Sequence, residues 1–451
     1  MSGGGEGSGS IALSAYLALS AVAGPVAPAL LARRRQRGKE DGARLGERLG
    51  RPAAPRPEGA LVWLHGASVG EGMSLLPVVE GLLALPAPPT CLLTTGTLTS
   101  AQLIAPRLAA LSRDGRALHQ FAPVDTRGAV RGFLNHWRPD LAIWAESEFW
   151  PRLMWETAGA RVPMMLVNAR VSAKSAAGWR RVPRMAGKLV GLFARIDAQD
   201  DTSAALLAGL GADPAALHVS GNIKTLLPPP DAAPEALSAL RAVLGERRRW
   251  LAASTHAPEE VAAVDAHLAI AGGDVGGARA APLLTMIAPR HPDRAQEVAE
   301  IAALRGLPHT RRSRGEGPPR ESGVWILDTL GEMGLWYRSC PVAFLGGSLA
   351  PMGGHNPFEP AALGTALVAG PSTQNFAPAY AALAEAGGYR AIRGPEELAP
   401  AVAALLGDAV ARRHIAASAE LALAGARPDL APIIDAAAGF LGAHGSGGVG
   451  A

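Results

Sequence analysis

Two acidic segments of the sequence combine residue types and spacing that suit a catalytic base. The first, HGASVGE at residues 65–71, follows an apolar run and precedes a helical pattern, so Glu71 would open the helix. Free backbone amides and the helix dipole at that position favour the ionised carboxylate that a base needs. Ser68 and Glu71 also have the spacing of a capping box, so a purely structural role stays open.

The second acidic segment, WAESEFWP at residues 144–151, also follows an apolar run. Glu146 and Glu148 lie there among Trp and Phe residues, where burial of a carboxylate is costly unless it has a partner or a task. Two interpretations are compatible with this composition. Either the aromatic residues form a core beside an exposed acidic loop, or they line a pocket for a large, partly apolar substrate.

The second half of the chain contains two segments that suit phosphate and nucleotide binding. Arg290 and His291 stand between an apolar run and a helical pattern, where helix amides could help to bind a phosphate. The longest motif, LGGSLAPMGGHNPFE at residues 345–359, would bring glycine backbone close to a ligand. In that motif Asn356 would cap the next helix, and Glu359 could hold ribose hydroxyls. Its glycine pairs are Gly346, Gly347, Gly353 and Gly354.

The sequence has neither a Walker motif nor a GxGxxG fingerprint followed by a ribose-binding acid. A nucleotide other than P-loop ATP or NAD is therefore the expected ligand of the second half.

The elements that must position these residues are short apolar runs that alternate with helical patterns. Such runs are typical of strands buried in a parallel sheet, with ligand-binding loops at their carboxyl ends. The sequence therefore predicts an α/β fold of two doubly wound, Rossmann-like domains with a cleft between them. The predicted strands are 61–65, 90–95, 140–145, 164–167, 196–198 and 218–221, then 250–253, 283–288, 324–327, 342–345 and 366–369.

Composition sets the predicted domain boundaries. A flexible start and a membrane anchor would occupy residues 1–40, and the proline-rich segment 226–234 would be a linker, because its prolines suit neither a helix nor a central strand. The N-terminal domain is then 41–225 and the C-terminal domain 235–435, followed by a flexible tail at 436–451. A chain of 451 residues is long enough for two domains that each bury a core.

Residues 11–32 contain no charged side chain and are followed by five Lys or Arg residues within 33–39. An apolar run of that length can span a bilayer as a helix, and the positive-inside rule then leaves the body of the protein in the cytoplasm. A cleaved signal peptide is the alternative, but it would carry its basic residues before the apolar run. The sequence thus predicts a single N-terminal membrane anchor.

The charge distribution favours an anionic partner other than nucleic acid. A net charge of +4, from 43 basic and 39 acidic residues, is too small to indicate a nucleic-acid-binding protein. Residues 157–196, however, carry eight basic and no acidic residues, which favours contact with an anionic surface or substrate. Two cysteines without metal-ligand spacing predict neither a disulfide scaffold nor a zinc site. The candidate contacts in the basic stretch are Arg170, Lys174, Arg180 and Arg181.

The order of these motifs resembles one known family, the bacterial 3-deoxy-D-manno-octulosonic acid (Kdo) transferases, which are GT-B glycosyltransferases that act on the lipid A precursor. Each motif alone is weak, but so many in one order are specific. The sequence departs from the family pattern at Gly66, where alanine is expected, and after Lys224, where an acid is usual. Further motifs in that order are NARVS at 168–172, GNIK at 221–224, STH at 254–256, PRHPDR at 289–294 and DTLGE at 328–332.

The resemblance implies inverting transfer of Kdo from CMP-Kdo to a sugar hydroxyl of the lipid A precursor, in lipopolysaccharide core synthesis. Glu71 would be the catalytic base, with Glu146 as the second acidic residue of the site. The donor-binding residues that the resemblance implies are Lys224, Arg290, His291, Gly346, Gly347, Gly353, Gly354, Asn356 and Glu359.

The same resemblance implies neither a cofactor nor a metal ion, because GT-B enzymes generally neutralise the leaving phosphate with helix dipoles and basic side chains. The implied partners are CMP-Kdo, the lipid A precursor and the anionic surface of a bacterial inner membrane, with the enzyme on its cytoplasmic face. No nucleic acid is expected. Two alternatives stay open: another GT-B sugar-nucleotide enzyme such as an epimerase, and a non-catalytic, membrane-tethered protein that binds lipopolysaccharide precursors.

Overall fold

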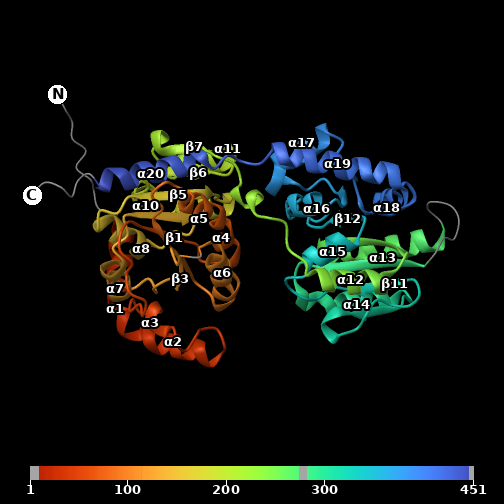
Figure 1. Ribbon diagram of the computed structural model, residues 1–451, viewed down its shortest axis with the longest axis horizontal. Coiled ribbons are helices and arrows are strands. Elements are labelled where there is room, and N and C mark those ends of the chain that lie inside the picture. The colour runs from red at the N-terminus through yellow and green to blue at the C-terminus, as the bar shows by residue number, and fades with distance from the viewer. Residues whose placement is uncertain (1–9, 113, 274–281, 446–451) are drawn as a thin grey trace, which may run out of the picture. The chain divides into compact units, whose positions relative to one another are not determined.

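The computed structural model describes residues 10–112, 114–273 and 282–445, which form two compact α/β units (Figure 1). The first unit contains the chain up to Leu227 together with the segment from Arg427 onward, and the second runs from Pro228 to Ala426. The two predicted α/β domains are thus confirmed, and the boundary between them falls in the proline-rich segment. The cleft between them stays a prediction.

Within the described residues, the first unit is built on a seven-stranded parallel sheet with the order β3-β2-β1-β4-β5-β6-β7. β1 pairs with β2 on one side and with β4 on the other, so the chain order reverses between β1 and β4. In doubly wound sheets, ligands bind outside the carboxyl ends of the strands at such a switch point. The strands are β1 (Leu61–His65), β2 (Thr90–Thr95), β3 (Ala117–Phe121), β4 (Leu141–Ala145), β5 (Met164–Ala169), β6 (Arg195–Ala198) and β7 (Leu217–Val219).

Helices cover both faces of this sheet, because alternate residues of each strand belong to different cores. Trp63 of β1 packs with Trp144 of β4 in one core, whereas Leu64 and Ile143 belong to the core on the other face. All four side chains are fully buried, which is why the strands are almost continuously apolar. The helices are α1 (Ile11–Val22), α2 (Ala27–Gln36), α3 (Leu45–Arg48), α4 (Val69–Ser74), α5 (Leu76–Leu83), α6 (Leu98–Leu111), α7 (Arg127–Trp137), α8 (Pro151–Gly159), α9 (Ala173–Trp179), α10 (Pro183–Val190), α11 (Asp201–Gly209) and α20 (Ala431–Gly445).

The second unit repeats this plan with the strand order β10-β11-β9-β8-β12-β13-β14, again all parallel among the described residues. β8 lies between β9 and β12, so the switch point of this sheet lies between β8 and β12. The strands are β8 (Arg248–Thr255), β9 (Leu283–Pro289), β10 (His309–Arg311), β11 (Gly323–Ile326), β12 (Val342–Leu345), β13 (Ala366–Ala369) and β14 (Tyr389–Ala391). The helices are α12 (Pro234–Leu244), α13 (Ala257–Gly272), α14 (Ala295–Leu304), α15 (Met333–Ser339), α16 (Phe358–Ala362), α17 (Ala377–Glu385), α18 (Leu398–Gly407) and α19 (Ala409–Gly425).

Three strands of the structure were not predicted from the sequence: β3, β10 and β14. Each lies at an edge of its sheet. Because an edge strand is covered less completely, its sequence need not be apolar, and all three contain polar residues that are partly exposed. An apolar-run criterion therefore finds the central strands and overlooks edges of this kind.

The end of the second domain and the flexible tail were predicted wrongly. Residues 436–445 continue the helix α20, which begins at Ala431 and belongs to the first unit (Figure 1). Ile433 and Ile434 are buried in the same core as Leu64, and a side chain at Gly81 of α5 would collide with Ile434. Burial of this apolar helix face explains why the chain returns to the first unit. Residues 446–451 and the start at 1–9 lie outside the described residues.

The predicted anchor is folded against the first unit as two short helices. α1 and α2 are joined by a 3₁₀ turn (Gly24–Val26), and α1 packs on α7 and α8. The Tyr16 hydroxyl donates to Asp125 Oδ2 (2.6 Å), and Arg152 Nε donates to Ser20 Oγ (3.0 Å). Among the described residues, no single helix is long and apolar enough to cross a membrane; α1 with the turn and α2 meets that criterion only as a pair bent by 45°. A single spanning anchor helix is therefore not confirmed.

Candidate active site

The carboxyl edge of the first sheet brings three predicted site residues together from separate loops. Glu71 lies in α4, directly after β1, and Glu146 follows β4. Lys224 lies in a 3₁₀ turn, η3 (Ile223–Leu226), after β7. Lys224 forms an ion pair with Glu146, and the charge of Glu146 acts on Glu71. Since β1 and β4 flank the switch point, the strand order explains why these carboxylates meet.

The Glu71 carboxylate is buried and held by its own turn. Its Oε2 accepts hydrogen bonds from the backbone N–H groups of Ala67 (2.7 Å) and Ser68 (3.2 Å), and its Oε1 accepts one from Ser68 Oγ (2.8 Å). In return, Ser68 Oγ accepts from the Glu71 N–H (3.3 Å). The capping box is therefore present. The same contacts hold the carboxylate in one orientation, which a base also requires.

Burial and two neighbouring carboxylates raise the pKa of Glu71. Burial contributes most, the charge of Glu148 next, and the charge of Glu146 less; hydrogen bonds from Ser68 oppose them. From the sequence, we expected the helix start to favour the ionised carboxylate of Glu71. That expectation was wrong for the net pKa shift, because the effect of desolvation is larger than that of the backbone amides. A carboxylate with a raised pKa is a stronger base once it is ionised.

Glu146 adopts a backbone conformation that is uncommon for residues other than glycine. Its φ is 59°, in the left-handed region, and its N–H donates to the carbonyl of Val167 on β5 (3.0 Å). Such conformations cost about 1–3 kcal/mol and cluster at functional sites. Here the left-handed residue directly follows β4 and carries the carboxylate that pairs with Lys224.

Two asparagines hold the turn that contains Lys224. Asn222 Oδ1 accepts from the Lys224 N–H (3.1 Å), and Asn168 Oδ1 at the end of β5 accepts from the Ile223 N–H (3.1 Å). The NARVS motif, through Asn168, and the GNIK motif, through Asn222, therefore stabilise the same turn. Lys224, predicted as a donor-binding residue, lies with the acidic residues of the first unit, whereas the other predicted donor-binding residues belong to the second unit.

The aromatic residues around the second acidic segment have two roles. Trp144 is fully buried in a core, as the first interpretation predicted. Trp150 is half-buried; its Nε1 donates to Glu148 Oε2 (2.8 Å), and its ring meets His65 edge-on with centroids 5.2 Å apart. Burial lowers the pKa of His65 to about 3, so this imidazole is neutral. Phe149 and Trp150 also line a pocket, which the second interpretation requires; the large, partly apolar substrate of that interpretation stays a prediction.

At the carboxyl edge of the second sheet, three histidines gather beside Arg290. His256 follows β8, His291 follows β9, and His355 lies in the loop after β12. The rings of His256 and His355 are stacked with centroids 5.3 Å apart, and the His291 ring lies 6.1 Å from that of His256. Arg290 and His291 were predicted, whereas His256 and His355 were not. Their position after central strands was the available signal.

This group has the electrostatics of an anion site. Burial, followed by the positive charges of His256, Arg290 and His291, lowers the pKa of His355 to about 4. Arg290 and His291 are exposed, and the Arg290 guanidinium donates no hydrogen bond to another described residue. Arg290 supplies a positive charge and the neighbouring imidazoles can supply N–H donors, which suits a phosphate.

The glycines of the longest motif are required by the fold of the second unit itself. A Cβ on Gly346 would lie 2.4 Å from the carbonyl oxygen of Ser254, at the end of β8. Positive φ angles of 66°, 83° and 77° add a second requirement at Gly347, Gly353 and Gly354. These glycines thus allow neighbouring loops of the protein to approach each other. Their contact with a nucleotide stays a prediction.

Glu259 of α13 holds the glycine loop in place. Its fully buried carboxylate accepts N–H groups from Gly347 (2.8 Å), Leu349 (2.9 Å) and Ala350 (3.2 Å), and also from His256 (3.0 Å). Four donors around one carboxylate compensate for its burial. The loops after β8 and β12 are consequently tied together at the switch point.

Asn356 and Glu359 bond to each other at the start of α16. Asn356 Nδ2 donates to Glu359 Oε1 (3.1 Å), and Asn356 Oδ1 accepts from the Phe358 N–H (3.0 Å). Asn356 therefore supports the helix start from the position before the N-cap, which is Pro357. Burial raises the pKa of Glu359. Whether either residue holds ribose or phosphate stays a prediction.

The basic residues predicted to contact an anionic partner lie around α9 in the first unit. All four are exposed, and the segment between α9 and α10 carries two of them. Arg195 of the same stretch is instead paired with Asp197 (2.8 Å). The exposed four are Arg170, Lys174, Arg180 and Arg181.

Within the described ranges, no group of three or more His, Cys, Asp or Glu side chains is arranged to hold a metal ion. The expectation of a reaction without metal or cofactor stays a prediction.

Comparison with known proteins identifies the family. Residues 43–227 match the family model of 3-deoxy-D-manno-octulosonic-acid transferase (kdotransferase). The chain is 32% identical over 378 residues to the "Probable 3-deoxy-D-manno-octulosonic acid transferase, mitochondrial" of Arabidopsis thaliana, covering 82% of each chain. It is 36% identical over 348 residues to the 3-deoxy-D-manno-octulosonic acid transferase of Bordetella pertussis, covering 76% of this chain and 78% of that one.

The solved structure of Anabaena HepE in complex with UDP-glucose has a similar fold, with a TM-score of 0.56 over 85% of this chain and 100% of that chain. At 16% identity, this likeness concerns the fold alone. The sequence relatives are matched over most of their length, in both halves of the chain. With motifs, strand order and relatives in agreement, the chain belongs to the 3-deoxy-D-manno-octulosonic acid transferase family.

Proposed function

We propose that this Kdo transferase takes Kdo from CMP-Kdo and adds it, with inversion, to a hydroxyl of the lipid A precursor, with Glu71 as the base. The observation that supports this proposal is the convergence of Glu71, Glu146 and Lys224 at the carboxyl edge of the first sheet. Glu71 combines burial, a fixed orientation and a raised pKa. These are the properties of a general base.

The reaction breaks the bond between the anomeric carbon of Kdo and a phosphate oxygen of CMP, and it joins that carbon to the acceptor oxygen. Glu71 takes the hydroxyl proton as the oxygen attacks, and CMP leaves from the opposite face with the bonding electron pair. Lys224 pairs with Glu146 and so limits the negative charge around Glu71. Arg290 and His291, exposed after β9, would stabilise the charge on the departing phosphate.

The decisive test is Glu71→Gln, because glutamine can still accept the backbone N–H bonds of the turn but cannot take a proton. With CMP-Kdo and a tetraacyl lipid A precursor, the wild type should yield a heavier lipid by mass spectrometry. The variant should lose roughly 10²–10⁴-fold in turnover and retain CMP binding and its unfolding transition. Glu80→Gln, at an exposed position on α5, is the matched control and should keep full turnover.

Unchanged turnover in Glu71→Gln would remove Glu71 as the base. Absence of product from the wild type, with intact CMP-Kdo, would overturn the proposed reaction and favour a non-catalytic binding protein. An epimerase is disfavoured because the sequence relatives are named transferases, and a product in which the lipid mass rises would exclude it directly.

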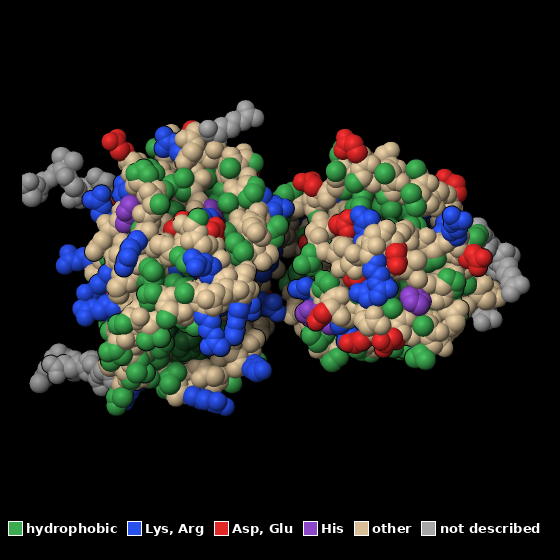
Figure 2. All heavy atoms as spheres, turned by 90° about the horizontal axis from the view of Figure 1, so that it is seen from below, with side chains coloured by type: hydrophobic (Ala, Val, Ile, Leu, Met, Phe, Trp, Pro, Cys, Tyr) green, Lys and Arg blue, Asp and Glu red, His purple; other side chains and the backbone are tan. Residues whose placement is uncertain are grey.

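We further propose that the first unit attaches to the cytoplasmic face of the inner membrane through its N-terminal helices and the basic residues around α9. Although α1 packs on the unit, Ile11, Leu19 and Val22 are 85%, 67% and 72% exposed. Figure 2 shows hydrophobic side chains beside Lys and Arg side chains on one face of this unit. A helix with an apolar outer side and basic neighbours is suited to lie in the membrane interface.

A further inference from the structure

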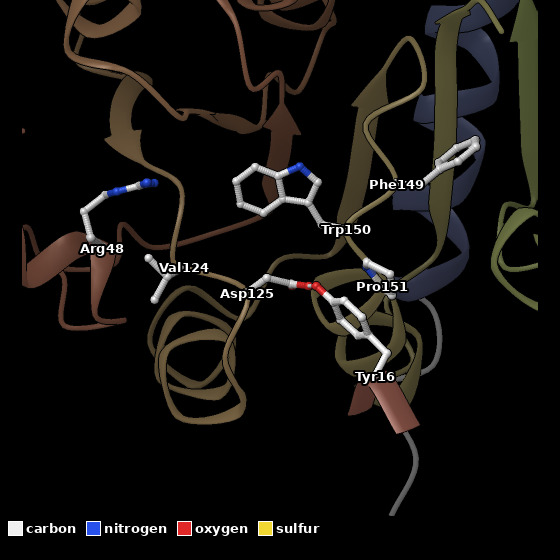
Figure 3. A pocket seen from close by; sticks show the side chains of 7 residues that line it. All are labelled: Tyr16, Arg48, Val124, Asp125, Phe149, Trp150 and Pro151. Atoms are coloured by element: carbon white, nitrogen blue, oxygen red, sulfur yellow. Dashed lines mark hydrogen bonds between the residues drawn. The ribbon is translucent and has the colours of Figure 1, made fainter. Parts of the chain in front are cut away.

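A pocket of about 340 Å³ opens in the first unit where α1, α3 and two loops meet. The loop after β3 contributes Val124 and Asp125, the loop after β4 contributes Phe149 and Trp150, and the start of α8 contributes Pro151. Tyr16 of α1 and Arg48 of α3 complete the lining (Figure 3). The volume lies in the range of small-molecule sites, about 300–1,000 Å³.

Arg48 is a buried cation with donor capacity left over. Its side chain is 9% exposed, and in Figure 3 its guanidinium points across the pocket toward the indole of Trp150. One nitrogen, Nη1, donates to the Ala122 carbonyl, while Nη2 donates to no described residue. Burial lowers the pKa of Arg48. A buried guanidinium with donor capacity left at Nη2 favours an anion in front of that nitrogen.

The acidic neighbours of Arg48 leave its Nη2 without a partner among the described residues. Glu40 lies 3.4 Å from Arg48 Nε, but its other oxygen accepts a closer bond from Arg34 (2.7 Å), so one carboxylate serves two guanidinium groups. Asp125 accepts the N–H groups of Arg152 (3.1 Å) and Leu153 (2.7 Å) at the start of α8, and within the pocket it also accepts the Tyr16 hydroxyl (2.6 Å). Asp125 keeps its own negative charge, because hydrogen bonds from neutral groups do not cancel it. The free donor capacity of Arg48 Nη2, and not a surplus of positive charge, is therefore what favours an anion in the pocket.

The pocket also borders the candidate active site. Trp150 forms a wall of the pocket, and its Nε1 donates to Glu148, whose charge raises the pKa of Glu71. On the opposite side, Tyr16 belongs to α1, the helix whose outer side carries exposed apolar residues. The pocket thus lies between the proposed base and the proposed membrane-facing helix. An indole wall suits a sugar ring, and a guanidinium suits a phosphate.

We propose that this pocket is a subsite for the phosphorylated sugar head of the lipid acceptor, with a phosphate ester bound by Arg48 and the sugar against Trp150. Identification of the ligand as the acceptor rests on the function proposed above. The presence of an anion site at Arg48 does not. The ester phosphate of a lipid and free phosphate share this chemistry, and a binding experiment distinguishes them.

The test is isothermal titration calorimetry in detergent, with the full chain and three probes: a tetraacyl disaccharide bisphosphate, the same lipid without its phosphates, and inorganic phosphate. Arg48→Gln should weaken binding of the bisphosphate lipid about tenfold or more and leave the dephosphorylated lipid unchanged. Inorganic phosphate should bind the wild type far more weakly than the lipid. Equal affinity for inorganic phosphate would overturn the acceptor assignment, and an unchanged preference in Arg48→Gln would overturn the site.

Glu40→Gln is the matched control for a structural role of the ion pair. It leaves the guanidinium in place and removes its partner, so the preference for the phosphorylated lipid should be kept or increased. A loss equal to that of Arg48→Gln would mean that Arg48 acts only through folding. If Arg48→Gln does not fold, Val124→Phe should fill the pocket and abolish the preference without touching Arg48; binding that survives the filled pocket would contradict the proposal.

Because binding is measured without turnover, the two proposals can fail separately. Phosphate-dependent binding at Arg48 in a protein that transfers no Kdo would overturn the proposed reaction and leave the subsite. Transfer of Kdo by a protein in which Arg48 has no role in acceptor binding would overturn the subsite and leave the proposed reaction.

Discussion

The ammonium group of Lys224 is ion-paired with the carboxylate of Glu146, and this pair joins the turn after β7 to the loop after β4. Glu146 in turn acts on Glu71, whose pKa it helps to raise. The cation therefore belongs to the electrostatic environment of the proposed base, although it comes from the far edge of the sheet.

Replacement of Lys224 should impair the proposed base without removing it. In Lys224→Met, the unpaired charge of Glu146 should raise the pKa of Glu71 further, so the acid limb of kcat/KM should move to higher pH. A double variant with Glu146→Gln should return the limb toward the wild-type position. The pH–rate profile measures this, with Lys188→Met on α10 as the control for loss of one positive charge. An acid limb that stays in place would contradict the coupling.

Removal of the Glu148 charge should lower the pKa of Glu71, opposite to the effect of replacing Lys224. Glu148 contributes more to the raised pKa of Glu71 than Glu146 does, so Glu148→Gln should shift the acid limb of kcat/KM to lower pH. The amide oxygen can still accept from Trp150 Nε1, which keeps the local structure. The expected shift is up to about one pH unit. The exposed variant Glu80→Gln should leave the profile unchanged, and an upward shift in Glu148→Gln would refute the assignment.

The raised pKa of Glu71 also has a consequence for stability. The folded protein binds this proton more tightly than the unfolded chain, so the stabilisation is complete below the ordinary carboxyl pKa and is lost as pH rises through the raised one. Urea unfolding across that window should show a smaller loss of stability in Glu71→Gln than in the wild type. Identical pH dependence in both proteins would show that Glu71 does not titrate there.

Gly346→Ala should destabilise the second unit, because the new Cβ would lie 2.4 Å from the Ser254 carbonyl oxygen and backbone must move. The expected loss is about 1–3 kcal/mol in the free energy of unfolding. Gly407→Ala at the end of α18 is the comparison, since no atom lies within 4 Å of its Cβ. Chemical denaturation with urea measures both. Equal stability of the two variants would mean that packing in this loop does not require glycine at position 346.

Loss of two exposed cations should weaken membrane binding. The double variant Arg180→Gln with Arg181→Gln should bind anionic vesicles about 30-fold more weakly at low salt, since each basic residue near such a surface contributes about 1 kcal/mol. Binding to zwitterionic vesicles should not change. Arg390→Gln with Arg393→Gln, both exposed in the second unit, is the charge-matched control. Equal losses in the two double variants would argue against a specific basic surface.

Deletion of the N-terminal residues is a poor test of attachment, because α1 is also part of the fold. Leu13 is buried, and Tyr16 and Ser20 bond to Asp125 and Arg152. Substitution of the exposed Leu19 and Val22 by serine keeps these contacts and should reduce vesicle binding while the unfolding transition stays in place. Unfolding of such a variant would show that these side chains are needed inside the protein.

The sequence alone was sufficient for the two-domain architecture and most central strands. Central parallel strands are buried on both faces, so burial appears directly as apolar runs, as in β1 and β4. The capping box at Ser68 and Glu71 was also predictable from the sequence, because it depends on two residues one helical turn apart. Three of the four edge strands, β3, β10 and β14, were not predicted, because their residues are partly polar and exposed. The return of α20 to the first unit was not predicted either, because its packing partners lie far along the chain.

The residue types of the candidate site were predictable, but their grouping was not. The motifs named Glu71, Glu146 and Lys224, yet only the strand order places Lys224 with Glu146 in the first unit. The direction of the Glu71 pKa likewise depends on burial and on charges brought from another loop. Arg48 had no sequence signal as a binding residue, because a lone arginine becomes a site only where folding buries it beside Trp150 and leaves donor groups unused. The sequence thus determines which residue types lie near each other along the chain. Distances between loops, burial and the electrostatic environment of a side chain are determined only by the tertiary structure.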